Sequence, residues 1–148
     1  MAGVAIELTI DGIDSAQERL ARLDLTDAEF RPLLSDIGEE VVLQTHERFE
    51  AGEDPAGEPW EPSARVEAEG GQTLVDKARL QNSIGYQVDG NQVETGTNAI
   101  YGAIHQFGGE DVNMDYIVER AYLPRTIDEI DSLEMMVDDF IAAAIGGS

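Results

Sequence analysis

Residues 26–52 read TDAEFRPLLSDIGEEVVLQTHERFEAG, and this stretch decides the fold. Its apolar face has a period near 3.6, as expected for an amphipathic α-helix, through Phe30, Leu33, Leu34, Ile37, Val41, Thr45 and Phe49. Thr26 and Glu29 form a capping box at the start, and Gly52 is the usual residue past a helix end. Pro32 falls early enough to be tolerated, and we expect it to shift the start toward Arg31. The stretch therefore predicts the longest helix of the chain.

The residues before this helix predict a strand and a short helix. Apolar residues alternate with Ala5, Glu7 and Thr9 at Val4, Ile6, Leu8 and Ile10. This period of two is typical of a half-buried strand. Asp11-Gly12 then predicts a turn, and a capping box at Ser15 and Glu18 predicts a helix that runs to about Leu23.

The residues after the long helix predict a hairpin and a final helix. A short helical or turn-like stretch from 74 to 80 precedes two alternating runs, which a three-residue turn at Asp89-Gly90-Asn91 joins into an antiparallel hairpin. Residues 100–107 predict a brief helix, and 116–118 a further strand. A capping box at Thr126 and Glu129 begins a final helix, with an apolar face at Ile127, Ile130, Leu133, Val137, Ile141 and Ala144. We expect one α+β domain over 1–148, with a single small antiparallel sheet packed against the long helix and a C-terminal helix.

The charge of the chain limits its partners. Asp and Glu number 31 against 9 Lys and Arg, which gives a net charge of -22. This field repels phosphate backbones, so we expect no sequence-specific nucleic-acid binding. Either the acidity is a solvated surface, as in a salt-loving host, or it lines a conduit through which DNA slides; we favour the solvated surface. The sequence shows no charged n-region followed by an apolar stretch and no apolar run long enough to span a membrane, so neither secretion nor membrane anchoring is expected.

No group of residues in the sequence indicates catalysis. His46 and Glu50 are spaced to share a helix face, but a zinc site needs further ligands, and the chain has no cysteine. Carboxylate pairs such as Glu39-Glu40 are too numerous for any one to indicate a hydrolase. Phosphate-binding loops and nucleophile elbows are absent from the sequence. We therefore expect no enzyme, no metal and no cofactor.

A long loop is predicted at about 52–72, where glycines and prolines interrupt every periodicity. Loops of this length are often functional, and this one carries the only tryptophan, Trp60. Trp60 either anchors a partner protein or folds back over the core, and the sequence leaves both open.

Several short segments follow one another in order from Phe49 onward: DPAGEPW at 54–60, LQNSI at 80–84, Gly96-Thr97, YGAIHQFG at 101–108 and RAYLP at 120–124. In these segments the sequence resembles the phage virion morphogenesis family, the Mu-type and related tail-completion proteins. Gly102 stands where alanine is common in that family. The resemblance implies a structural virion protein made in the host cytoplasm, located at the neck or the head-proximal end of the tail. It also implies a homo-oligomeric ring that contacts the tail tube or tail terminator and neck or connector proteins.

The candidate contact residues lie in these segments. We expect protein-interface or loop-anchoring roles for Pro59, Trp60, Tyr101, His105, Phe107, Arg120 and Leu123. For His105 we favour a buried, hydrogen-bonded role over that of a ligand. Two other functions stay open: an acidic binding module that mimics DNA, and a carboxylate-dependent hydrolase.

Overall fold

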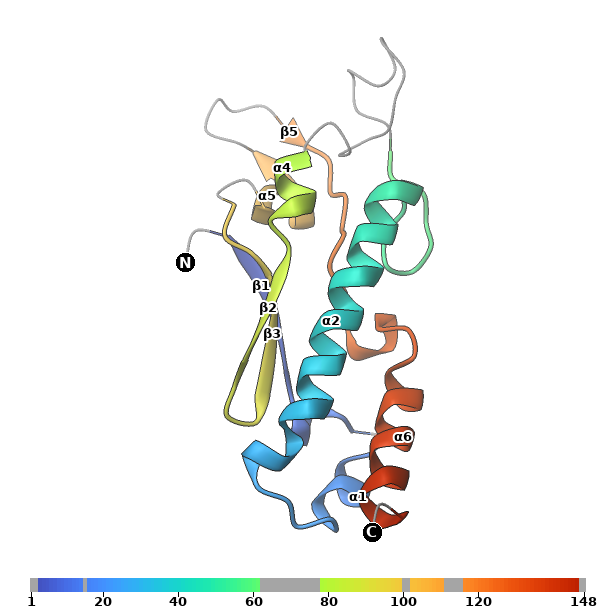
Figure 1. The fold of residues 1–148 in the computed structure, drawn as a ribbon. Coiled ribbons are helices and arrows are strands. Elements are labelled where there is room, and N and C mark those ends of the chain that lie inside the picture. Colours follow the sequence, from blue (N-terminus) through green and yellow to red (C-terminus); the bar gives the residue numbers. More distant parts are fainter. Residues whose placement is uncertain (1–2, 15, 62–77, 100–101, 111–115, 147–148) are drawn as a thin grey trace.

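Helix α2, Asp27–Ala51, forms the axis of the protein (Figure 1). The structure is a computed structural model that describes residues 3–14, 16–61, 78–99, 102–110 and 116–146. The predicted capping box is confirmed: Thr26 Oγ1 accepts a hydrogen bond from the Glu29 N–H at 3.2 Å, and Glu29 Oε1 accepts one from the Thr26 N–H at 3.1 Å. Gly52 ends the helix with a φ of 71°, a left-handed conformation that glycine adopts without strain. The predicted shift of the start toward Arg31 is wrong, because this capping box fixes the start and leaves Pro32 inside the helix.

Three strands form an antiparallel sheet in the order β1-β3-β2. These are β1 (Val4–Thr9), β2 (Gly85–Asp89) and β3 (Gln92–Thr97). The predicted hairpin is present, but its turn has two residues instead of three, because Asp89 pairs directly with Gln92. Gly90 has a φ of 60°, and glycine at the first central position is typical of a type II′ turn.

The sheet has one face toward α2 and one toward solvent, as antiparallel sheets often do (Figure 1). The inner face carries Leu8 opposite Val93 and Ile6 opposite Thr95. Tyr86 also lies on this face and packs against α2 at Gly38, where an added Cβ would stand 2.4 Å from the Tyr86 ring. Gly38 thus permits the close approach of helix and sheet.

The helix between β1 and α2 is shorter than predicted, and a 3-10 turn precedes it. A 3-10 turn, η1 (Ile10–Gly12), follows β1 and is capped by Thr9 Oγ1, which accepts from the Gly12 N–H at 3.0 Å. Helix α1 spans Gln17–Ala21, so it ends before the predicted Leu23. Its N-cap is Ala16, which has no capping side chain, and the Ser15 of the predicted capping box lies outside the described residues.

The final helix, α6, spans Leu133–Gly146 and packs against α2 (Figure 1). The prediction that it begins at Thr126 is wrong. Residues Ile127–Glu129 form a separate 3-10 turn, η2, and the Thr126 side chain caps nothing. Glu129 instead turns its carboxylate to Arg125, whose backbone N–H donates to Glu129 Oε1 at 2.7 Å.

The remaining elements gather at the end of the protein opposite the C-terminus (Figure 1). They are α4 (Ala78–Asn82), α5 (Gly102–Phe107), β4 (Gly109–Glu110) and β5 (Tyr116–Ile117). Strand β5 pairs with β4 in a second, two-stranded sheet, so the prediction of a single sheet is wrong. Residues 62–77 of the predicted loop and helical stretch lie outside the described part of the chain. None of the helices within the described ranges is long and apolar enough to cross a membrane.

Two hydrophobic clusters are joined by α2. The lower core lies between the sheet, α1, α2 and α6 and comprises Leu8, Ile10, Ile13, Ala16, Leu20, Phe30, Leu33, Leu34, Ile37, Val41, Val93, Ile130, Leu133, Val137 and Ile141. The upper cluster comprises Phe49, Trp60, Leu80, Ile84, Tyr122 and Leu123. The predicted fold class, an α+β protein with an antiparallel sheet packed against a long helix and a C-terminal helix, is confirmed.

Candidate interaction site

The first part of the predicted long loop, residues 52–61, is a folded turn that returns the chain to the end of α2. The Trp60 N–H donates to the Gly52 carbonyl at 2.8 Å, which closes the turn. Inside it, Asp54 Oδ1 accepts from the backbone N–H groups of Ala56 and Glu58, each at 2.9 Å. These bonds hold Pro59 in an exposed position at the edge of the turn.

Trp60 points into the upper cluster. Only 7% of its surface is exposed, and its ring meets Phe49 edge-on, with ring centroids 5.7 Å apart. Its indole Nε1–H donates to the Ala121 carbonyl at 2.8 Å. In this structure Trp60 therefore fastens the turn to the core, one of the two roles that the sequence left open.

Gln106 organises the segment that Trp60 contacts. Its side chain is 2% exposed, and its Oε1 accepts from the N–H groups of both Tyr122 and Leu123 at 3.0 Å. Its Nε2 donates to the Leu123 carbonyl at 2.9 Å. One amide thus satisfies three backbone groups of a buried strand-like segment that has no sheet partner for them. Sequence reasoning did not select Gln106, although it lies inside the YGAIHQFG motif.

Tyr122, whose backbone N–H donates to Gln106, belongs to the upper cluster. It is fully buried, 5.2 Å from Phe49 between ring centroids, and its hydroxyl donates to the Gly102 carbonyl at 2.6 Å. Burial raises the pKa of this hydroxyl, so it stays a donor at neutral pH. A Cβ on residue 102 would lie 2.6 Å from Thr97 Cγ2, which explains why glycine stands here.

The structure brings Trp60, His105, Arg120 and Leu123 together as buried residues. Leu123 is fully buried, and His105 and Arg120 are 4% and 7% exposed. The Arg120 backbone N–H donates to the His105 carbonyl at 2.8 Å, and its side-chain Nε–H donates to the Glu61 carbonyl at 2.7 Å. Four of the seven candidate residues are therefore part of the folded interior.

Phe107 differs from these residues because 63% of it is exposed. It ends α5, and the next residue, Gly108, donates to the Ile104 carbonyl at 2.7 Å. An exposed phenylalanine held on a short helix is suited to contact another protein. Pro59 is the other exposed candidate, and Tyr101 lies outside the described residues.

An ion-pair network ties the turn to the C-terminal segment. Arg125 contacts Asp54 at 3.0 Å and Glu129 at 2.8 Å. The hydrogen bonds from Arg125 lower the pKa of the Glu129 carboxyl. For Asp54, burial acts to raise the pKa, but the bonds from Glu58, Arg125 and Ala56 together lower it.

Arg125→Gln is expected to reduce the free energy of unfolding by about 1 kcal/mol at pH 7, since the network is partly solvated. Both carboxyl pKa values are depressed in the folded protein, so their contribution is present above the ordinary values of 3.8 and 4.5 and is lost as the pH falls through the folded values. Urea unfolding of both proteins can be measured between pH 7 and pH 3, a range chosen around these pKa values. The difference in their free energies of unfolding should become smaller as the pH falls. A difference that stays constant with pH would contradict this account.

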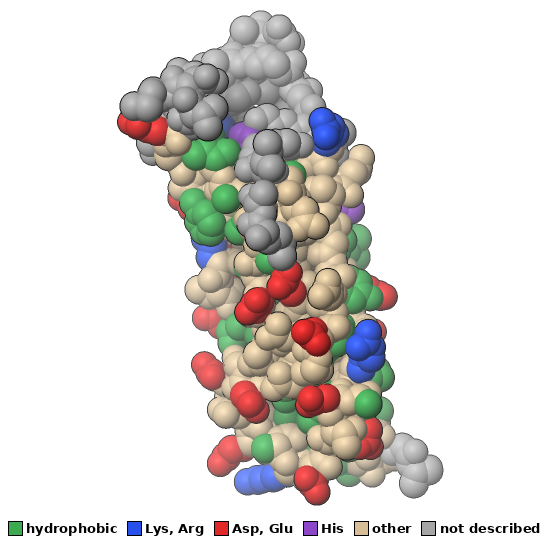
Figure 2. Space-filling view, turned by 90° about the vertical axis from the view of Figure 1, so that its left-hand side faces the viewer, with side chains coloured by type: hydrophobic (Ala, Val, Ile, Leu, Met, Phe, Trp, Pro, Cys, Tyr) green, Lys and Arg blue, Asp and Glu red, His purple; other side chains and the backbone are tan. Residues whose placement is uncertain are grey.

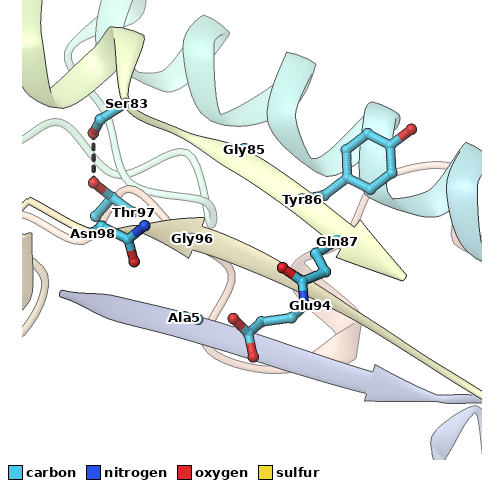
Figure 3. Close-up of a pocket in the computed structure, with 9 residues that line it drawn as sticks. All are labelled: Ala5, Ser83, Gly85, Tyr86, Gln87, Glu94, Gly96, Thr97 and Asn98. Atoms are coloured by element: carbon cyan, nitrogen blue, oxygen red, sulfur yellow. Dashed lines mark hydrogen bonds between the residues drawn. The ribbon is translucent and has the colours of Figure 1, made fainter. Parts of the chain in front are cut away.

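Among the described residues, no group of three or more His, Asp or Glu side chains is placed to hold a metal ion. A shallow hollow of about 220 Å³ lies on the outer face of the sheet (Figure 3). Small or polar residues line it, with the carboxylate of Glu94 as its charged group.

Comparisons with known proteins identify relatives. A model of the phage virion morphogenesis family matches residues 11–141. The chain is also similar to a protein of Haemophilus influenzae described as Mu-like prophage FluMu G protein 2, with 33% identity over 105 residues. This alignment covers 71% of the chain and 72% of the relative. No solved structure matches the chain.

Proposed function

The chain belongs to the phage virion morphogenesis family, and we propose that it is a non-catalytic subunit that completes the tail at the head-tail neck of a tailed-phage particle. A role in virion morphogenesis follows from the family. The location at the neck and the ring of identical subunits are our proposal, as is contact with the tail tube or terminator and the connector.

The exposed Phe107 supports a function in assembly. The buried candidates stabilise the fold, whereas the Phe107 side chain contributes little to the interior. Exposed aromatic residues surrounded by polar surface often become the buried centre of an interface. A hydrolase or a DNA mimic would depend mainly on carboxylates, so an exposed phenylalanine adds no specific support to either.

Phe107→Ala is expected to leave the folded protein intact and to lower the yield of complete particles at least about tenfold, as expected for an aromatic interface centre. The measurement is complementation of a phage that lacks this gene, together with the mass of the purified protein alone and with the tail-tube subunit. The thermal midpoint of the variant should match the original protein, because the side chain is 63% exposed.

Leu43→Ala is a matched control, since Leu43 is also an exposed apolar residue, at 52%, but lies on α2 away from α5. Normal particle yield with Phe107→Ala, together with a protein that is strictly monomeric and binds no virion component, would overturn the proposal.

A further inference from the structure

Strand β2 forms an edge of the sheet, and α2 packs against its inner face. It is the last strand in the order β1-β3-β2, and four of its five residues are exposed. Its sequence, GYQVD, contains neither proline nor lysine, and it pairs with β3 without a bulge. Proline, lysine and a bulge are among the features that commonly block an edge strand.

The free edge presents the backbone groups of Tyr86 and Val88. Asp89 and Gln92 close the two-residue hairpin and therefore bond to each other. Because bonded and non-bonded pairs alternate, Gln87 and Gly85 also bond toward β3. The N–H and C=O groups of Tyr86 and Val88 consequently point away from β3, into the space where a fourth strand would lie.

Carboxylates stand on both sides of this edge. On the outer face, Glu94 lies beside Gln87 (Figure 3). Glu94 also lies directly opposite Glu7, and such like-charged pairs weaken a sheet. On the helix side, Glu39 accepts a hydrogen bond from the Tyr86 hydroxyl at 3.2 Å. The three strands contain Glu7, Asp89 and Glu94 but no lysine or arginine.

The surrounding surface has the same charge. Figure 2 shows acidic side chains scattered across this face, with the few basic ones toward its margins. At the hairpin turn, Asp27 Oδ2 lies 3.8 Å from where a Cβ on Gly90 would stand. A strand added to β2 therefore meets negative charge on both of its faces and at its end.

We propose that β2 accepts, as a fourth strand, an extended segment rich in lysine or arginine from another virion protein. Main-chain bonds to Tyr86 and Val88 supply the affinity, and the carboxylates select a basic sequence. A second copy of this chain fits less well, because it would bring its own charge of -22 and further carboxylates to the same edge. The identification of the partner as a virion protein rests on the proposed function.

Amide hydrogen exchange tests the edge directly. In the free protein the Tyr86 and Val88 amides should exchange faster than those of Gln87 and Asp89. A synthetic peptide of about ten residues that alternates threonine and lysine should slow Tyr86 and Val88 at least about tenfold. A peptide that alternates threonine and glutamate should have no effect.

Gln87→Lys adds a positive charge to an exposed position of this strand and should weaken binding of the lysine peptide about fivefold at low salt. Met135→Lys is the charge-matched control, since Met135 is 63% exposed and lies on α6. It should leave binding almost unchanged. In complementation, Gln87→Lys should reduce particle yield, whereas Met135→Lys should not.

The inference is wrong if the Tyr86 and Val88 amides stay unprotected with the lysine peptide, or if both peptides protect them equally. It is also wrong if protection rises with protein concentration alone, because the edge would then serve self-association. The proposed function fails separately. If the protein is absent from particles but the exchange results hold, β2 binds a basic segment of another origin, and the proposed function is wrong.

Discussion

Gln106→Leu is expected to lower the free energy of unfolding by at least about 3 kcal/mol. The substitution keeps a side chain of similar size but removes the partners of two N–H groups and one carbonyl in residues 122–123. Each buried polar group left without a partner costs about 1 to 3 kcal/mol. Since small domains are stable by only about 5 to 15 kcal/mol, this change removes a large part of the total. Urea unfolding followed by Trp60 fluorescence measures it.

Gln106→Glu separates hydrogen bonding from packing. At neutral pH its carboxylate still accepts from Tyr122 and Leu123 but cannot donate to the Leu123 carbonyl, and burial disfavours its charge. On protonation it regains a donor, so its deficit relative to the original protein should shrink as the pH falls. Gln106→Leu should show no such recovery. If the leucine variant is as stable as the original, the role assigned to this amide is wrong.

Trp60→Ala is expected to lower the free energy of unfolding by about 3 to 5 kcal/mol, the range for truncation of buried aromatic residues. The change leaves a cavity beside Phe49 and removes the donor to the Ala121 carbonyl. The variant has no tryptophan, so unfolding is followed by circular dichroism. Any loss of particles with this variant should accompany a loss of folded protein.

Trp60→Phe is the matched variant for the hydrogen bond. It retains an aromatic ring against Phe49 but has no N–H for Ala121, so we expect an intermediate loss of about 1 to 3 kcal/mol. A protein with Trp60→Ala that folds normally yet fails to assemble would contradict the buried role and return Trp60 to the interface.

Periodicity predicted those elements whose ends depend on local bonds. The long helix has its capping box at Thr26 and its glycine at 52, both properties of neighbouring residues. Strand β1 likewise alternates because one of its faces lies toward the hydrophobic core. Such features repeat along the chain and can be found without knowing what lies beside them.

The start of α6 could not be predicted because distant residues determine it. Gln44 on α2 accepts from the Asp131 N–H at 3.0 Å and donates to the Asp131 carbonyl at 2.7 Å. Ser132 then has a φ of 65°, which no helix permits. Thr126 and Glu129 have the spacing of a capping box, but Glu129 pairs with Arg125 instead. Together with the contacts at Asp131, this pairing delays the start of the helix.

For the candidate site, sequence reasoning selected the right segments but could not assign their exposure. Motif residues at 105 and 120 are buried and Phe107 is exposed, although nothing in their order distinguishes them. Gln106 was missed because a polar residue next to an aromatic one is usually interpreted as a surface residue. The open edge of β2 was also missed, since it depends on the strand order.

The unbroken length of α2 has a consequence for how the protein can serve in a larger structure. Its 25 residues span about 37 Å and are anchored at both ends, by the upper cluster and by the lower core. Other proteins bound near α5 and near the hairpin turn would therefore be held at a constant separation. Such a subunit would set spacing by its own rigidity.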